Sequence, residues 1–346
     1  ISLLGFMYLF YIAFRKRIPS TLLVIALLVM SINSFLLYYG SQTYNEAFYL
    51  LVQMALVLVF FRYFIDYEQA LPLKKEFYRH LYLALCLLAL TLTKNMGYSA
   101  VFAVGGYFLL RGQWKNLVFS VAAFAILLVV FQGVKYVLWD ESGAQFSSQG
   151  SGLLNKDYYN PQAGKEDLAG YFNRLTGNSN LYLSKHFTSV LGFRKAEPIM
   201  TVNSLVTLLL YLMAIGSLII TYIKNRYLFF TGLLSGSFLV ITFIVLQTKW
   251  DQSRLIIPAV PMLILMLFAG LYYISAFKKY KILQVTVPVL ALLVFFQSLA
   301  VTAVAVKSNQ EISGRYGGLT PDWKNYLKAS EWASENLPED AIVACR

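Results

Sequence analysis

Long runs of apolar residues without an internal charge recur along most of this chain. Seven of them cover residues 20–38, 47–61, 117–134, 204–223, 228–246, 255–277 and 282–306. A helix needs roughly 20 mostly apolar residues to cross a hydrocarbon core about 30 Å thick, so runs of this kind predict membrane-spanning helices. Three shorter runs cover residues 1–14, 81–93 and 97–110. With these counted as spans, we expect an all-α integral membrane protein with about ten transmembrane helices.

The predicted spans fall into two groups. Residues 1–134 hold about six and residues 202–306 about four, and a long polar loop over residues 135–201 separates them. Residues 307–346 contain an amphipathic helix pattern at 326–337, a turn at 338–340 and a strand pattern at 341–346. A helix, a turn and a lone strand do not form a core. We therefore expect the start of a truncated soluble α/β C-terminal domain here, and we also expect sequence upstream of Ile1.

Composition supports the membrane class. The chain has 346 residues, of which 58% are hydrophobic and 13% charged, and its mean hydropathy is +0.59. Soluble domains carry about 25% charged residues. The two cysteines, Cys86 and Cys345, offer no disulfide framework and no paired-cysteine metal motif.

The net charge of +12 is a topology signal and does not indicate nucleic-acid binding. Alternate connections, taken from the first, hold fourteen basic residues, whereas the short connections of the other set hold three: Lys94, Lys249 and Arg254. Because basic residues favour cytoplasmic loops, the first set is predicted to be cytoplasmic. The loop over residues 135–201 and the C-terminal segment are then extracytoplasmic, and so is any active site.

Two charged residues stand at the outer ends of predicted spans. Glu46 ends a polar run at 41–46, and it is either a general base, a metal ligand or a carboxylate that stabilises a helix N-terminus. Lys94 is the only charge between two apolar runs. It either binds a phosphate or extends to the membrane interface as an anchor. The sequence leaves the alternatives open for both residues.

A third polar stretch precedes the span at 255–277. It contains Lys249, Asp251 and Arg254, and two prolines follow at positions 258 and 261. Cations beside backbone carbonyls that proline leaves unpaired suit an anionic lipid headgroup. The alternative is an Asp251–Arg254 pair that caps a helix.

The long loop combines aromatic and polar residues, which suits carbohydrate, because sugar rings stack on aromatic faces while their hydroxyls need polar partners. Arg174, Tyr182 and His186 are its candidates for contact with a sugar or an acceptor. Lys185 precedes His186, and the histidine is either catalytic or solvated.

Three stretches resemble one enzyme family. They are SQTYNEAF (41–48), WDQSRLIIPAVP (250–261), and YLKASEW (326–332) followed by ENLPEDAIV (335–343). Together they are similar to the GT-C membrane glycosyltransferases of glycosyltransferase family 39, the protein-mannosyltransferase and aminoarabinose-transferase type. Leu255 stands where the family has an aromatic residue.

The resemblance implies transfer of a hexosyl or pentosyl group from a polyprenyl-phosphate donor to an acceptor hydroxyl on a lipid, a glycan or a protein. It implies a multi-pass protein of the bacterial inner (plasma) membrane whose site faces the periplasm. The family's catalytic Asp would precede Ile1, which leaves Glu46 as an auxiliary carboxylate. Lys94, Asp251 and Arg254 would lie at the lipid phosphate. No cofactor is certain, and a divalent metal is left open.

Two other functions fit many of the same features. An O-antigen polymerase or ligase also uses lipid-linked sugars, but it would have more arginines in its outer loops than Arg174 and Arg194. A lipid-linked sugar transporter or flippase would show paired repeats and broken helices at the midplane. This sequence shows no internal repeat, and its charges lie at the outer ends of the spans instead of mid-span.

Overall fold

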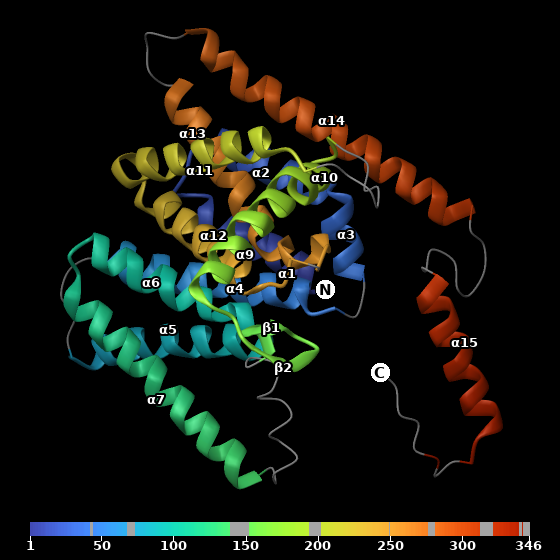
Figure 1. Ribbon diagram of the computed structural model, residues 1–346. Helices are drawn as coiled ribbons and strands as arrows, with labels where there is room; N and C mark the ends of the chain where they lie inside the picture. Colours follow the sequence, from blue (N-terminus) through green and yellow to red (C-terminus); the bar gives the residue numbers. More distant parts are fainter. Residues whose placement is uncertain are drawn as a thin grey trace. The chain divides into compact units, whose positions relative to one another are not determined.

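The computed structural model of the protein describes residues 1–41, 44–67, 73–138, 152–193, 202–248, 250–275, 281–311, 321–338 and 341. The chain divides into two compact units, Ile1–Ser298 and Leu299–Arg346. Helices dominate the described residues of both units (Figure 1).

The helices follow the apolar runs. In the first unit they are α1 (Ser2–Phe14), α2 (Ser20–Ser31), α3 (Ser34–Ser41), α4 (Glu46–Phe60), α5 (Leu73–Thr93), α6 (Ser99–Leu110), α7 (Trp114–Leu138), α9 (Leu168–Leu181), α10 (Thr188–Val190), α11 (Ser204–Lys224), α12 (Arg226–Val245) and α13 (Val260–Ser275). Helix α14 (Lys281–Glu311) runs across the boundary between the units, and α15 (Pro321–Asn336) belongs to the second. Nine of the ten predicted apolar runs each fall largely within one helix, whereas the run at 20–38 is divided between α2 and α3.

Six helical segments of the described residues are long and apolar enough to cross a membrane. Helices α2 and α3, which meet at a bend of 58°, add a seventh if they form one span. These segments agree with the prediction of a multi-pass all-α membrane protein. The number of ten spans stays a prediction, because α1 and α6 have only 13 and 12 residues and α5 begins with a charged turn.

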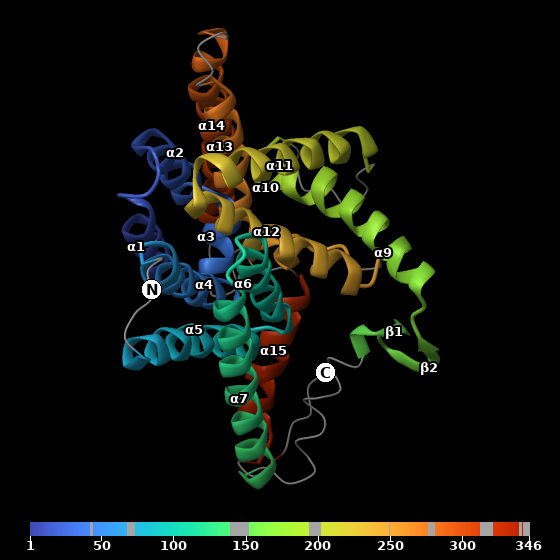
Figure 2. The same cartoon turned by 90° about the vertical axis from the view of Figure 1, so that its left-hand side faces the viewer.

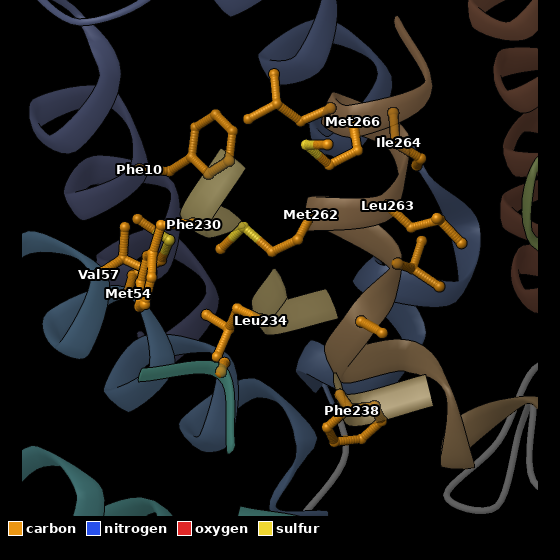
Figure 3. Packing of buried hydrophobic residues seen from close by; sticks show 14 of the residues in the cluster. Phe10, Met54, Val57, Phe230, Leu234, Phe238, Met262, Leu263, Ile264 and Met266 are labelled. Atoms are coloured by element: carbon orange, nitrogen blue, oxygen red, sulfur yellow. The ribbon is translucent and has the colours of Figure 1, made fainter. Parts of the chain in front are cut away.

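Four helices supply the centre of the first unit. Side chains of α1, α4, α12 and α13 interdigitate there, among them Phe10, Met54, Phe230 and Met262 (Figure 3). Phe60 of α4 stacks on Phe230, with 3.8 Å between ring centroids. In contrast, α7 and α11 leave most of their apolar side chains exposed within the protein, which suits contact with lipid.

The predicted outer loop contains regular structure. Strands β1 (Asn155–Asp157) and β2 (Asn160–Lys165) form an antiparallel hairpin, which lies at the N-terminal end of α9 (Figure 2). Asp167 caps α9 by accepting a 2.7 Å hydrogen bond from the backbone N–H of Gly170. Asn178 then binds α9 to the end of α12, because its Nδ2 donates to the carbonyls of Phe243 and Leu246 at 2.9 and 2.8 Å.

The second unit contains the predicted amphipathic helix. Helix α15 covers Pro321–Asn336, so it begins five residues before the predicted segment at 326–337. Residues 342–346 of the predicted strand lie outside the described residues. A soluble C-terminal α/β domain therefore stays a prediction.

Candidate functional site

A cavity of about 660 Å³ lies where three connections of the first unit meet. The end of α3 and Tyr44, which lies just before α4, form one side. The π-helical turn η4 (Tyr182–Phe187) and α10 form the second, and the segment before α13 forms the third. All three connections are predicted to be extracytoplasmic. The lining residues are Tyr38, Tyr39, Tyr44, Lys185, His186, Ser189, Asp251, Gln252, Ser253 and Arg254.

Asp251 organises the charged part of this cavity. One carboxylate oxygen, Oδ2, accepts a hydrogen bond from Lys185 Nζ, and the other, Oδ1, lies 2.5 Å from His186 Nε2. The side chains of Lys185 and His186 are nearly buried, whereas 41% of the Asp251 side chain is exposed. The carboxylate is therefore the part of this network that solvent or a ligand reaches most easily.

Opposing effects set the protonation of this network. Burial alone would raise the pKa of Asp251, but hydrogen bonds from Lys185 and His186 outweigh it and hold that pKa below its usual value. Burial lowers the pKa of His186 despite the neighbouring carboxylate. Near neutral pH the carboxylate is thus ionised and His186 neutral, so Nε2 carries the proton that faces Asp251. This tautomer leaves His186 Nδ1 as a proton acceptor.

Tyr182 holds both halves of the network in place. Its hydroxyl donates a hydrogen bond to the carbonyl of Trp250, the residue before Asp251. Its ring lies against His186, with 5.1 Å between ring centroids. Tyr182 is completely buried and lies outside the cavity lining. Its contacts therefore position Asp251 and His186 without reaching the cavity.

Arg254 is the cation of the cavity that no carboxylate of the described residues neutralises. Its guanidinium carbon lies 5.1 Å from the centroid of the Tyr44 ring, a distance typical of cation–π contact. Its buried Nε has no hydrogen-bond partner among the described residues. Since Asp251 binds Lys185 and His186, the described contacts do not include the Asp251–Arg254 pair considered above.

Glu46 and Lys94 form an ion pair beside the cavity, outside its lining. Lys94 Nζ lies 3.1 Å from Glu46 Oε1, and Glu46 is the first residue of α4, where the helix dipole favours a negative charge. Burial lowers the pKa of Lys94, and the charge of Arg254 lowers it further against the effect of Glu46. The positive charge of Arg254 is thus near enough to oppose a further positive charge on Lys94.

Arg174 lies away from the cavity lining and holds the hairpin in place. Its guanidinium pairs with Glu166 at 2.5 Å. It also donates to the carbonyls of Leu153 at 3.0 Å and Asn155 at 2.6 Å, and to that of Val245 in α12 at 3.3 Å. These contacts account for its burial, and its contact with a sugar stays a prediction.

The structure adds residues that the sequence had not singled out. Tyr38, Tyr39, Tyr44 and Ser253 line the cavity. Tyr38 and Tyr39 precede the polar run at 41–46, Tyr44 lies within it and Ser253 precedes Arg254, so their closeness in sequence to the charged candidates was the available signal. Lys249 lies outside the described residues. In the part of the chain that the structure describes, no group of three or more His, Cys, Asp or Glu side chains is arranged to hold a metal.

Comparison of the chain with family models, with curated proteins and with solved structures finds no match. Its function is therefore inferred from the chemistry of the cavity.

Proposed function

We propose that this protein is a membrane glycosyltransferase, which moves a sugar from a polyprenyl-phosphate donor to an acceptor hydroxyl at the extracytoplasmic cavity. One observation carries the proposal. Arg254, a cation without a carboxylate partner among the described residues, shares a cavity with the Asp251–His186–Lys185 network at the ends of long apolar helices. The family resemblance points to the same reaction.

The phosphate of the donor needs a cation at the membrane surface. When the bond between the anomeric carbon and the phosphate oxygen breaks, the polyprenyl phosphate leaves with the electron pair and gains negative charge. A guanidinium stabilises that charge more in the transition state than in the ground state, which lowers the barrier. Arg254 suits this role because its guanidinium lies at the Tyr44 ring and no carboxylate of the described residues competes for it. Lys94 is paired with Glu46 and lies outside the lining, so its contribution at the phosphate is secondary to that of Arg254.

The acceptor hydroxyl has to lose its proton as its oxygen bonds to the anomeric carbon. In this chain the neutral His186, held by Asp251 through Nε2, offers Nδ1 as a proton acceptor. The resemblance assigns the main base to an acidic residue of another outer loop, with His186 and Asp251 then orienting the acceptor. The tyrosines of the lining offer aromatic faces to a sugar ring.

Binding of a polyprenyl phosphate to the purified protein tests the donor site. Because a hydrogen bond to a charged group contributes about 1.5–3 kcal/mol, Arg254→Gln is expected to weaken binding about tenfold or more. Lys165→Gln is the matched control, since Lys165 is exposed on β2 outside the cavity lining. The uncharged polyprenol should bind the wild-type protein weakly. Equal binding of polyprenol and polyprenyl phosphate, or unchanged binding by Arg254→Gln, would reject the site.

Transfer of a labelled sugar in membranes tests the reaction. Membranes that contain the wild-type protein should release polyprenyl phosphate from the sugar-loaded donor, and Asp251→Asn and His186→Gln should slow this release. If donor binding depends on Arg254 but no sugar leaves the donor with any acceptor, the protein is a carrier of the lipid-linked sugar and the transferase proposal fails.

A further inference from the structure

A second cavity, of about 920 Å³, lies at the opposite end of α4. Helix α4 continues into the π-helical turn η1 (Phe61–Ile65), and together they form a 20-residue apolar segment. At 1.5 Å per residue this segment is about 30 Å long, which matches the hydrocarbon thickness of a bilayer. The two cavities therefore lie toward opposite membrane surfaces, and the distribution of basic residues assigns this one to the cytoplasmic side.

The lining of the second cavity is strongly basic. Arg15, Lys16 and Arg17 follow α1, and Arg62 belongs to η1. Asp66 is the only acidic residue among the described lining residues, which leaves a net charge of +3.

Asp66 is already used within the protein. Arg17 Nη2 lies 2.5 Å from Asp66 Oδ2, and the Tyr227 hydroxyl donates to Asp66 Oδ1 at 2.7 Å. Arg17 also donates to the carbonyl of Ala13 at 2.7 Å, and its own carbonyl accepts from Asn225 at 2.9 Å. Through these hydrogen bonds, Arg17 and Asp66 connect the ends of α1 and η1 to the start of α12.

The positive charges of the other three basic residues in the lining are not neutralised in this way. Arg15, Lys16 and Arg62 are exposed, and among the residues that the structure describes none of them forms an ion pair with a carboxylate. Three neighbouring positive charges raise the local electrostatic potential, which attracts an anion.

The remaining lining is apolar and aromatic. Leu58, Val59 and Leu85 line the cavity on the membrane side of the cations. Tyr63 and Tyr82 also belong to the lining, with 5.8 Å between their ring centroids, and tyrosine is enriched at the depth of lipid headgroups. The cavity therefore presents cations and an apolar surface together, as a lipid requires and a soluble anion does not.

We propose that this cavity binds an anionic phospholipid from the cytoplasmic leaflet. The phosphate of the headgroup lies among Arg15, Lys16 and Arg62, and an acyl chain extends along Leu58 and Val59. The proposal is independent of glycosyl transfer, because the two cavities lie at opposite ends of α4.

Native mass spectrometry of the purified protein in detergent tests this site with defined lipids. Wild-type protein should retain phosphatidylglycerol and should bind phosphatidylcholine far less. A basic residue near an anionic membrane surface contributes about a fivefold change in affinity, and the contributions of two such residues multiply. Lys16→Gln/Arg62→Gln is thus expected to weaken phosphatidylglycerol binding about twenty-five-fold. Arg111→Gln/Lys115→Gln is the matched control, since both residues are exposed on the same predicted face and lie outside the lining.

A charge-preserving variant separates lipid binding from folding. Lys16→Arg/Arg62→Lys should bind phosphatidylglycerol within about threefold of the wild-type protein, and every variant should elute as a single species in size-exclusion chromatography. Unchanged binding by the Gln double variant, or equal weakening in the control, would overturn the site. Competition by inorganic phosphate or glycerol phosphate as strong as that by the lipid would assign the cavity to a soluble anion and overturn the lipid.

Discussion

Glu46 and Lys94 form an ion pair, 3.1 Å between Oε1 and Nζ, which joins the first turn of α4 to the connection after α5. Only 4% of the Glu46 side chain and 15% of the Lys94 side chain are exposed. Asn45 Nδ2 donates a 2.8 Å hydrogen bond to the carbonyl of Thr93, which adds a second contact between the start of α4 and the end of α5. Because Lys94 is influenced by the charge of Arg254, the pair links the packing of two helices to the electrostatics of the cavity.

Glu46→Gln should destabilise the protein by about 3 kcal/mol, because it leaves a buried ammonium group without its partner charge. Denaturant unfolding in detergent measures this loss. The double variant Glu46→Gln/Lys94→Gln should recover part of it, since no charge then remains buried. A double variant that is as unstable as the sum of both single variants would show that the two side chains do not interact.

Acidification should destabilise the protein partly through His186. Its folded pKa lies below the unfolded value of 6.5, so the unfolded chain binds more protons and the free energy of unfolding falls as pH drops through this window. The folded pKa of Asp251 lies below 3.8, so its contribution is present above that pH and is lost only as pH falls through the folded pKa. Melting temperatures of His186→Gln between pH 7 and about pH 4 should fall less steeply than those of the wild-type protein.

The second histidine offers the comparison. His80 is the only other histidine of the chain, and it contacts Ser120 at 2.9 Å in another part of the first unit. Burial lowers its pKa to about 4, so His80→Gln should also flatten the pH dependence, in addition to the effect of His186→Gln. If His80→Gln flattens the pH dependence and His186→Gln leaves it unchanged, the assignment to the Asp251 network is wrong.

Arg174→Gln should release the β1–β2 hairpin from α9 and α12. The substitution removes the ion pair to Glu166 and leaves carbonyls of Leu153 and Asn155 without their donor, at a cost of about 3 kcal/mol. Limited proteolysis should then cleave the chain between residues 152 and 167 faster than in the wild-type protein. Binding of polyprenyl phosphate should persist, because Arg174 lies outside the cavity lining. Loss of binding without faster cleavage would instead support a direct contact with the ligand.

Gly97→Ala should disturb the turn after Lys94. A Cβ at this position would lie 2.7 Å from the backbone nitrogen of Thr91 and closer still to the carbonyl of Leu90, so α5 and η2 (Asn95–Tyr98) would have to separate. We expect a loss of about 2 kcal/mol in the free energy of unfolding, within the range for a packing clash. Gly106→Ala is the control, because nothing lies within 4 Å of its added Cβ and alanine favours the helix by about 1 kcal/mol. Equal stability of the two variants would contradict the close approach.

The helices were predictable because their cause is local. A run of apolar residues without charges satisfies its backbone hydrogen bonds only as a helix in a membrane, and the ten predicted runs fall largely within helices. The residues of the cavity were partly predictable for a similar reason, since Asp251 and Arg254 are charges beside an apolar run. The hairpin at 155–165 was missed, because its two strands are short and polar and Arg174, which donates to the carbonyl of Asn155, lies 19 residues further along the chain.

Which helices lie inside and which residues meet was decided by the tertiary structure. Helices α7 and α12 are both strongly apolar, yet α12 is mostly buried and α7 mostly exposed within the protein. Lipid and protein interior are equally apolar, so composition does not distinguish these two environments. The ion pair of Glu46 with Lys94 and the network of Asp251 with His186 join positions 48 and 65 residues apart. By itself the sequence determined where the helices form and which polar groups stand at their ends, whereas only the packing of the helices decided which of those groups became partners.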